Sequence, residues 1–425
     1  MEFQTLCVLG LGYIGLPTAS TFATYGMHVV GVDVNPQVVH TLQNGNVHIY
    51  EPGLRTLVQA ALKSGNLVIA SQPEPADAFI IAVPTPFKDG KAADLQFVVS
   101  ASQAIAPVLK KGNLVVLEST SPPRTTLDVV RPILEGSGLR AGEDFFLAYT
   151  PERVLPGQIL RELIENARVI GGIDRASAEA GQALYGKFVR GEIILTDATT
   201  AEMVKLMENT YRDINIAAAN EFARLADRFG VDVWEAIQLA NRHPRVNILN
   251  PGPGVGGHCI SVDPWFLVEA APDLATLIRT ARIVNDSQPE YVVDCIERCA
   301  GTLAGKRLAV LGLAYKADVD DMRESPAIEI AHRLSKRGAL IKAYEPFMRG
   351  GNLAGLPVEP SLEAAIQDAD ILALLVGHSQ LRQLNPEVVA RQTSARLVFD
   401  CTNCWQPNKW RAAGFQIVRL GAMKK

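Results

Sequence analysis

The chain has 425 residues, of which 48% are hydrophobic and 20% are charged, and its formal net charge at neutral pH is −4. This length is sufficient for two or three hydrophobic cores of about 150 residues each. The small net charge and the lack of a sustained basic block do not indicate nucleic acid or an anionic membrane surface as a partner. No uninterrupted apolar run reaches the ~18 residues that a membrane span requires.

The cysteines and the first residues indicate the compartment. Six cysteines are few for this length and indicate free thiols in a reducing environment. The start, MEFQTLCVLGLGYIGLP, has glycines within its apolar run and no cationic segment before it, which favours a buried strand and turn over a signal peptide. Cys401 and Cys404, in CTNC, suggest a zinc or redox site, but no second ligand pair stands at a suitable spacing. We therefore expect a cytoplasmic protein without a metal site.

Up to about Asp197, short apolar runs alternate with helix-like segments. The runs are TLCVLG, HVVGVD, AFIIAVP, NLVVLEST, FFLAYTP and ARVIGG. Alternation of this kind is typical of a doubly wound parallel sheet with helices on both faces. We therefore predict a Rossmann-like domain over residues 1–198.

A glycine fingerprint follows the first of these runs. Gly10, Gly12 and Gly15 form G-x-G-x-x-G before a predicted helix, where glycines allow a tight turn and a close approach of backbone to a pyrophosphate. Asp33 ends the second run, where a carboxylate accepts hydrogen bonds from both ribose hydroxyls and repels a 2′-phosphate. The pattern predicts NAD rather than NADP, and a glycine-rich turn that binds nothing is the alternative.

Helical patterns replace the strand patterns over residues 199–301, which we predict to be a central helical domain. The segment Ala201–Gly230 is typical of one long helix with an apolar line at spacings of three and four. Lys205, Asn209 and Arg212 form a separate polar line at i, i+4 and i+7. This line is either one wall of a site or an ordinary solvated helix face.

The stretch NPGPGVGGHCISVDP places Cys259 on a loop of glycines and prolines. Such a thiol can act as a nucleophile if a cation stabilises its thiolate, and a small buried residue in a turn is the alternative. Beside an NAD site, a thiol can trap an aldehyde as a thiohemiacetal, whose oxidation gives a thioester that water hydrolyses to an acid. That chemistry requires a donor for the oxyanion and a base for the water.

From Lys306 the alternation of strand and helix resumes, and we predict a second Rossmann-like domain over residues 302–425. At the position of the fingerprint only Gly312 remains, Ala314 stands where a glycine is expected, and Lys316 follows two residues later. This eroded turn either holds a different nucleotide, with Lys316 or Arg323 supplying positive charge, or carries plain solvated charges. The predicted fold class is α/β, with two Rossmann-like doubly wound domains joined by a central helical domain.

Seven segments of the chain carry a resemblance to a known family. In chain order they are GLGYIGLP, AVPTP, EST, TPERVLPG, AEMVKLMENTYRDINIAAANE, GPGVGGHCISVDP and GLAYKADVDDMRESPA. Through them the chain resembles the UDP-glucose/GDP-mannose dehydrogenase family over nearly its whole length. The resemblance implies an NAD-dependent, four-electron oxidation of a UDP-sugar at C6 for bacterial surface polysaccharides. It also implies a homodimer that pairs through the central helix.

The resemblance implies a role for each matching residue. Cys259 is expected to be the nucleophile, Lys205 and Asn209 to stabilise the oxyanion, Asp263 to position water or assist proton transfer, and Glu152 to activate the water. The residues implied in NAD binding are Gly10, Gly12, Tyr13, Ile14, Gly15, Asp33, Thr85, Thr120, Thr126 and Arg323. Those implied in binding the nucleotide sugar are Arg153, Val154, Lys205, Asn209, Arg212, His243, Arg245, Gly256, Tyr315 and Lys316.

Some positions depart from the family's UDP-glucose members. Pro156 stands where they carry a glutamate, and Ile260 and Val262 where they carry phenylalanine and lysine. With LANRHPRVNI and GGHCISVDPWFLV, these differences favour a UDP-N-acetylhexosamine, first UDP-N-acetyl-D-mannosamine and, as the alternative, UDP-N-acetyl-D-glucosamine. Arg124 stands where relatives tend to have glycine, and a bulky cation there is expected to alter the loop over the nicotinamide near Thr126.

Two other interpretations remain open. A two-electron hydroxyacid dehydrogenase with the same two-domain plan would need no cysteine. A nucleotide-binding sensor or scaffold without turnover would keep the fold but lose the chemistry. A histidine before a proline, such as His243, is also typical of a surface or capping group.

Overall fold

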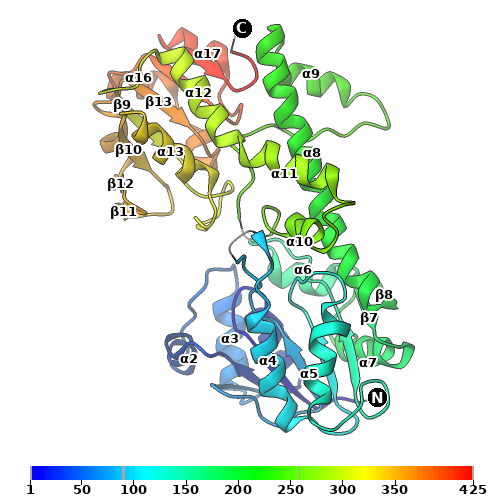
Figure 1. Cartoon of the computed structure of the whole chain (residues 1–425). Helices are drawn as coiled ribbons and strands as arrows, with labels where there is room; N and C mark the ends of the chain where they lie inside the picture. Colours follow the sequence, from blue (N-terminus) through cyan, green and yellow to red (C-terminus); the bar gives the residue numbers. More distant parts are fainter. Residues whose placement is uncertain (1, 89–90, 258, 424–425) are drawn as a thin grey trace. The chain divides into compact units, whose positions relative to one another are not determined.

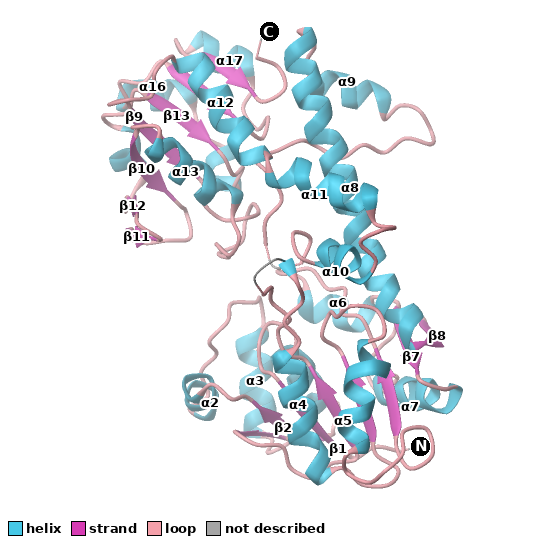
Figure 2. Cartoon of the chain, in the orientation of Figure 1, coloured by secondary structure: helices cyan, strands magenta, loops and turns pink. Residues whose placement is uncertain are grey.

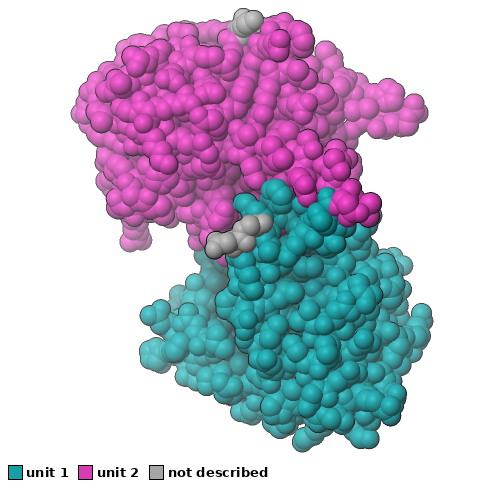
Figure 3. Space-filling model, in the orientation of Figure 1, with its two compact units in different colours: residues 1–208, 265–272 teal, residues 209–264, 273–425 magenta. Residues whose placement is uncertain are grey.

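The computed structural model of the chain describes residues 2–88, 91–257 and 259–423 (Figure 1). It divides into two compact units, which Figure 3 shows in different colours. Unit 1 and unit 2 consist, respectively, of Met1–Glu208 with Trp265–Pro272 and of Asn209–Pro264 with Asp273–Lys425. The division falls within a single helix of 32 residues, α8 (Ala198–Phe229).

Unit 1 contains an eight-stranded sheet with the strand order β3-β2-β1-β4-β5-β6-β7-β8. Neighbouring strands are parallel except β6 and β7, which are antiparallel. The strands from β1 to β8 are Thr5–Leu9, His28–Val32, Leu67–Ala70, Ala78–Ile81, Leu114–Leu117, Phe146–Tyr149, Arg168–Gly172 and Ile193–Asp197. Because β2 and β4 flank β1 on opposite sides, the chain changes direction across the sheet at the carboxyl ends of β1 and β4, which is where ligands bind in such folds.

Helices cover both faces of this sheet (Figure 2). The α-helices from α1 to α7 are Gly15–Thr24, Pro36–Gln43, Leu54–Lys63, Gln96–Ile105, Arg131–Glu135, Ile159–Glu165 and Arg175–Tyr185. Two short helices of other types are η2 (Ala106–Val108, 3₁₀) and η3 (Thr126–Val130, π).

Side chains of β1 alternate between two cores. Leu6 and Val8 pack with residues of α1, α3, α6 and α7, whereas Cys7 and Leu9 pack with residues of α4 and α5. A strand that is buried on both faces has no polar side, which explains why its sequence is a nearly continuous apolar run.

Unit 2 contains a seven-stranded sheet with the order β11-β12-β10-β9-β13-β14-β15, parallel except for the β11–β12 hairpin. The strands from β9 to β15 are Arg307–Leu311, Leu340–Tyr344, Gly351–Leu353, Leu356–Val358, Ile371–Leu374, Leu397–Asp400 and Gln416–Arg419. The helices from α13 to α17 are Pro326–Lys336, Leu362–Ile366, Ser379–Arg382, Pro386–Gln392 and Pro407–Ala412. Residues of β9 again alternate between two cores, with Leu308 and Val310 in one and Ala309 and Leu311 in the other.

The part of the chain between β8 and β9 is helical. After α8 it contains α9 (Val233–Ala240), α10 (Asp263–Ala270), α11 (Thr276–Asp286) and α12 (Gln288–Ala300). The predicted fold class is therefore confirmed, and so is the single long helix predicted over Ala201–Gly230. In the described residues, no helix combines the length and the apolar character needed to cross a bilayer.

Candidate active site

The glycine fingerprint forms the turn between β1 and α1. Gly10 has φ +92°, and a Cβ there would lie 2.5 Å from the Ala82 carbonyl oxygen; a Cβ on Gly15 would lie 1.8 Å from the Gly10 carbonyl oxygen. Both positions therefore require glycine. A Cβ on Gly12 would meet no described atom within 4 Å, so the backbone there faces open space that a phosphate can enter. Tyr13 and Ile14, at the start of α1, are half-buried.

Asp33, which follows β2, is hydrogen-bonded to this turn. One carboxylate oxygen accepts a hydrogen bond from Leu11 N over 3.0 Å, and the other accepts one from Asn35 N over 2.9 Å. The remaining lone pairs of the half-buried carboxylate are available to ribose hydroxyls. The residues present thus fit the adenosine and pyrophosphate parts of a dinucleotide.

The loops after β4 and β5 are joined at the same edge of the sheet. The Thr85 hydroxyl donates to the Thr120 carbonyl oxygen over 2.6 Å, and the Ser119 hydroxyl donates to the Val83 carbonyl oxygen over 2.7 Å. Thr85 and Thr120 are half-buried. Both residues predicted for NAD binding therefore lie together at strand ends, as the fold requires of ligand-binding loops.

Thr126 is held by a carboxylate that the sequence did not point to. Glu202, buried in α8, accepts hydrogen bonds from Thr126 N and Oγ1 over 2.8 and 2.6 Å, and from Arg124 N over 2.5 Å. Burial raises the pKa of Glu202, and these hydrogen bonds oppose that effect. Thr126 is itself fully buried, so its hydroxyl is committed to Glu202 in this state. Arg124 has φ +73°, a conformation that favours glycine.

The TPERV segment lies beside Lys205. The Glu152 side-chain Oε1 accepts hydrogen bonds from Arg153 N and Val154 N over 2.6 and 2.9 Å. The Lys205 Nζ donates to the Glu152 main-chain oxygen over 2.7 Å. Arg153 Nη1 contacts Glu208 Oε1 at 2.9 Å. Unit 1 therefore brings together Glu152, Arg153, Val154 and Lys205.

A buried ion cluster adjoins Glu152. Arg168 donates to Glu152 Oε2 over 2.9 Å and to Glu118 Oε1 over 3.0 Å, and Tyr185 donates its hydroxyl to the same Glu118 oxygen over 2.9 Å. Sequence reasoning missed Arg168, Glu118 and Tyr185. Nothing in ARVIGG distinguishes Arg168 from an arginine at the start of any strand, and its two carboxylate partners lie 50 and 16 residues away in the chain.

Unit 2 brings together Asn209, Cys259 and Asp263. The Asn209 Nδ2 donates to the Asp263 Oδ2 over 2.6 Å, and both side chains are buried. The Cys259 carbonyl oxygen accepts hydrogen bonds from Val262 N and Asp263 N over 2.9 and 2.8 Å, which places the half-buried cysteine just before α10. The predicted nucleophile and the predicted proton-transfer residue are thus neighbours in space.

Tyr315 packs against the cysteine loop. A Cβ on Gly257 would lie 2.8 Å from the Tyr315 ring, and a Cβ on Gly256 would lie 2.4 Å from the Glu324 carbonyl oxygen, so both positions require glycine. The next residue after Tyr315, Lys316, is exposed. Arg323 is exposed as well and contacts Asp321 at 2.6 Å within unit 2.

Arg212, His243 and Arg245 are exposed. Arg245 N donates to His243 Nδ1 over 3.3 Å, which sets the turn after α9. The described structure gives these three side chains no contact with Cys259, Asn209 or Asp263. Their assignment to the nucleotide sugar stays a prediction.

Buried amides hold the start of the cysteine loop. The Asn220 side-chain oxygen accepts a hydrogen bond from Gly252 N over 2.9 Å, and the Gln288 side chain donates to Gly252 O over 3.1 Å. Asn220 Nδ2 donates to Asn285, which in turn donates to Asp213. This set of polar side chains, absent from the sequence predictions, fixes the backbone that leads to Cys259.

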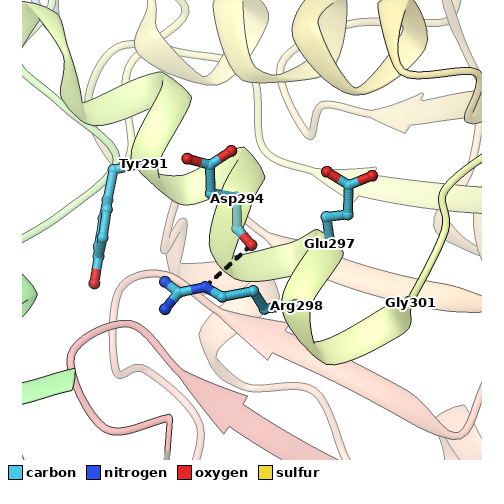
Figure 4. Close-up of a pocket in the computed structure, with 5 residues that line it drawn as sticks. All are labelled: Tyr291, Asp294, Glu297, Arg298 and Gly301. Atoms are coloured by element: carbon cyan, nitrogen blue, oxygen red, sulfur yellow. Dashed lines mark hydrogen bonds between the residues drawn. The ribbon is translucent and has the colours of Figure 1, made fainter. Parts of the chain in front are cut away.

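A separate surface hollow of about 700 Å³ lies along α12 (Figure 4). Its lining residues are Tyr291, Asp294, Glu297, Arg298 and Gly301. None of the predicted site residues is among them. Arg298 Nε donates to the Asp294 carbonyl oxygen over 3.4 Å, a contact drawn as a dashed line in Figure 4.

Comparison with protein families matches three successive parts of the chain to one family. Residues 4–189 match the NAD binding domain of the UDP-glucose/GDP-mannose dehydrogenase family, residues 199–287 its central domain, and residues 309–407 its UDP binding domain.

Individual relatives are similar over nearly their full length. The NDP-N-acetyl-D-galactosaminuronic acid dehydrogenase of Ralstonia nicotianae is 50% identical over 418 residues, covering 96% of this chain and 98% of the relative. The UDP-N-acetyl-D-mannosamine dehydrogenase of Methanococcus maripaludis is 47% identical over 429 residues, covering 99% and 97%. A solved structure of the UDP-N-acetyl-mannosamine dehydrogenase of S. aureus matches with a TM-score of 0.90 and 44% identity, covering 99% of each chain.

Proposed function

Because the chain belongs to the UDP-glucose/GDP-mannose dehydrogenase family, we propose that it oxidises the C6 hydroxymethyl group of UDP-N-acetyl-D-mannosamine to a carboxylate. The enzyme is an NAD-dependent UDP-sugar dehydrogenase, and the proposed conversion removes four electrons. Atoms and charges balance when R–CH₂OH, two NAD⁺ and one water give R–COO⁻, two NADH and three protons. The product, UDP-N-acetyl-D-mannosaminuronate, would serve surface polysaccharide synthesis in the cytoplasm.

The names of relatives support an N-acetylated amino sugar as the substrate class. Two of the three relatives described above are named for UDP-N-acetylmannosamine. Pro156, Ile260 and Val262, which depart from the UDP-glucose members, support the same class. UDP-N-acetyl-D-glucosamine is the alternative drawn from the sequence. The name of the Ralstonia relative, an NDP-N-acetyl-D-galactosaminuronic acid dehydrogenase, adds an N-acetyl-D-galactosamine nucleotide sugar as a further candidate.

The fingerprint turn and Asp33 are the residues that hold NAD in this proposal, with Thr85 and Thr120 beside them. NAD supplies the hydride acceptor for each of the two oxidations. The open backbone at Gly12 would accommodate the pyrophosphate, and the Asp33 carboxylate would accept hydrogen bonds from the ribose. We assign residues 1–198 to this NAD-binding domain, 199–301 to the central domain and 302–425 to the UDP-sugar domain.

Cys259 is the nucleophile in our mechanism. After the first oxidation its sulfur attacks the C6 aldehyde, so that a C–S bond forms and the thiol proton passes to the aldehyde oxygen, giving a thiohemiacetal. Loss of a hydride from C6 and of the hydroxyl proton gives a thioester on Cys259. The covalent bond prevents escape of the reactive aldehyde between the two oxidations.

Lys205 and Asn209 stabilise the negative oxygen on C6. They stand four residues apart in α8, so both side chains project from the same face of the helix. Of the three N–H donors of Lys205, one contacts the Glu152 carbonyl oxygen, and of the two on Asn209, one contacts Asp263. The remaining donors can stabilise an alkoxide or oxyanion, an interaction that typically contributes about 10²–10³ in rate per donor.

Glu152 and Asp263 serve the hydrolytic step. Three donors contact the two carboxylate oxygens of Glu152, which leaves one of about four lone-pair directions for a water. Such a water can lose a proton as it attacks the thioester, and the acid and the Cys259 thiol are then released. Asp263, buried beside Cys259, assists proton transfer to the sulfur.

We also propose a homodimer. Large apolar side chains of unit 2 lie exposed on α8 and α11: Tyr211 is 68% exposed, Phe229 73% and Leu277 66%. Exposed apolar surface of this kind is typical of a protein–protein contact, and closed symmetric pairing is the commonest arrangement. Sedimentation equilibrium giving the mass of two chains would support this assignment, and the mass of one chain would contradict it.

The observation that carries the proposed function is the cluster of Cys259, Asn209 and Asp263 within a chain of this family. The test is to supply UDP-N-acetyl derivatives of mannosamine, glucosamine and galactosamine, and UDP-glucose, separately, and to measure NADH formed. We expect the highest kcat/KM with UDP-N-acetyl-D-mannosamine. A higher value with another sugar corrects the substrate, and thermal stabilisation by UDP-sugars without any NADH would support a sensor or scaffold instead.

A further inference from the structure

Five residues of unit 1 form a continuous set of buried contacts that ends on Lys205. Arg168 bridges two carboxylates, with one terminal nitrogen on Glu118 at 3.0 Å and the other on Glu152 at 2.9 Å. Its guanidinium carbon lies 4.4 Å from the centre of the Tyr185 ring. The main-chain oxygen of Glu152 accepts the Lys205 hydrogen bond at 2.7 Å. None of these side chains except Lys205 and Glu152 has a role in the mechanism above.

The antiparallel pairing of β7 with β6 explains the position of Arg168. Tyr149, the last residue of β6, pairs with Gly171. Because the strands run in opposite directions, continuing this register by three residues sets Arg168 opposite Glu152. β5 ends beside β6, with Leu117 paired to Tyr149, so Glu118 follows at the same edge. One inverted strand thus brings a cation to the edge of the sheet where ligands bind.

The two carboxylates that contact the Arg168 guanidinium keep it charged and in place. Although burial opposes its charged form, the carboxylates of Glu152 and Glu118 together raise the pKa of Arg168 above its ordinary value. Burial raises the pKa of Glu118 to about 7, against the opposing effect of Arg168. Glu118 Oε2 has no hydrogen-bond partner among the described residues. The groups that face Glu118 are Arg168 on β7, Glu152 after β6 and Tyr185 on α7.

We propose that Arg168 is a positioning residue for Lys205. By bridging Glu118 and Glu152, it fixes the side chain of Glu152, whose Oε1 also accepts the Arg153 and Val154 amides. The Glu152 side chain is held by Arg168 and by the main-chain amides of the next two residues. These contacts restrict rotation of the Glu152 peptide group, so its main-chain oxygen, which orients the Lys205 ammonium, is fixed as well. This inference rests on the proposed function, because Lys205 matters only if an oxyanion forms at C6.

The first test is Arg168→Lys in the full-length enzyme. A lysine keeps the charge but cannot bridge two carboxylates with a planar fork. We expect kcat to fall at least ~10-fold while KM changes less than ~3-fold, since a misplacement of about 1 Å affects the transition state more than substrate binding. The matched control is Arg175→Lys, which alters the exposed pair of Arg175 with Glu179 in the same unit and should leave kcat unchanged.

A double-mutant cycle tests whether Arg168 acts through Lys205. In a Lys205→Met background, we expect Arg168→Lys to change the remaining rate of NADH formation by less than ~2-fold. If Arg168→Lys lowers the rate equally in both backgrounds, Arg168 acts independently of Lys205 and the proposal is overturned. A folded Arg168→Lys enzyme with wild-type kcat overturns it too. Production of two NADH per sugar by the wild type tests the proposed function separately.

Glu118→Gln provides a second variant should Arg168→Lys not fold. It is nearly isosteric and keeps an oxygen acceptor for Arg168 and Tyr185. The wild-type log kcat should show an inflection near pH 7, where Glu118 ionises and the charge on the cluster changes, and this inflection should be absent from Glu118→Gln. Identical pH profiles for the two enzymes would mean that the cluster only stabilises the fold, which would overturn the proposal.

Discussion

The amide of Asn209 donates a hydrogen bond to the carboxylate of Asp263 over 2.6 Å, and both side chains are buried. The contact joins α8 to the first residue of α10, four residues after Cys259. It fixes which way the Asn209 amide faces, so that its second N–H has a defined direction. In the mechanism proposed above, that N–H faces the negative oxygen of the substrate.

Asp263→Asn should therefore impair the chemical step. The substitution removes the charged acceptor of the Asn209 hydrogen bond, and the amide is then free to reorient. We expect kcat to fall by about 10²-fold, within the range seen on loss of one oxyanion donor, with little change in KM. Steady-state NADH formation measures both constants. The control is Asp273→Asn, at an exposed position of unit 2; a loss below ~3-fold in the Asp263 variant would contradict the assigned role.

The buried Glu118 predicts a specific dependence of stability on pH. Its pKa in the folded protein is about 7, against 4.5 for an ordinary glutamate, so the native state keeps a proton that the unfolded chain has released. Between these two values stability falls as the pH rises, by up to about 3 kcal/mol. Glu118→Gln lacks this effect. The Tm of the wild type minus that of the variant should be several degrees higher at pH 5 than at pH 8 in scanning calorimetry, and a constant difference would contradict the buried ionisation.

The backbone of Arg124 predicts a difference between two small substitutions. Arg124→Gly and Arg124→Ala both remove the exposed ion pair with Asp128, so that loss cancels in the comparison. With φ +73°, alanine keeps the strain and glycine relieves it, and we expect the glycine variant to be more stable by about 1 kcal/mol. Thermal unfolding of the two variants under one condition measures this difference. Equal stability would show that the loop does not hold Arg124 at positive φ.

The side-chain amides that hold the start of the cysteine loop predict that their removal changes the reactivity of the Cys259 thiol. Asn220→Ala leaves Gly252 N without its acceptor, so the loop should become more mobile, and the rate of alkylation of Cys259 by iodoacetamide should rise several-fold. Peptide mass spectrometry reports Cys259 and the half-buried Cys299 and Cys404 in one sample. Asn352→Ala, which removes an amide acceptor in the β11–β12 hairpin, serves as the control. An unchanged rate at Cys259 would mean that Asn220 does not govern the loop.

Much of the fold could be predicted because strands that are buried on both faces have nearly continuous apolar sequences. Every run named from the sequence corresponds to a strand, from TLCVLG at β1 to ARVIGG at β7. The strands that were missed are short or partly exposed. β3 has four residues, one of which is exposed, and in β8 no residue is fully buried. The strands of the β11–β12 hairpin have three residues each, too few for a periodic pattern.

The residues of the candidate site divide in a similar way. Gly10, Gly15 and Cys259 can be identified from the sequence because they lie in recognisable motifs, the glycine fingerprint and the loop of glycines and prolines. Arg168 and Glu202 do not, since their partners lie in other elements and only the folded chain brings them together. The apolar line predicted for the segment that forms α8 includes Met207 and Tyr211, which are 56% and 68% exposed. Periodicity identifies an apolar face and does not identify what covers it.

The thioester route through Cys259 is tested by the number of NADH formed per UDP-N-acetyl-D-mannosamine consumed, for the wild type and for Cys259→Ser. We predict two NADH per sugar for the wild type and, for the variant, a stall or a severe loss, because serine does not support the thioester route. Mass spectrometry of the quenched wild-type enzyme should show the sugar bound at Cys259. One NADH per sugar, unchanged by the substitution, would rule out the thioester route and mean that the cysteine loop is only a turn.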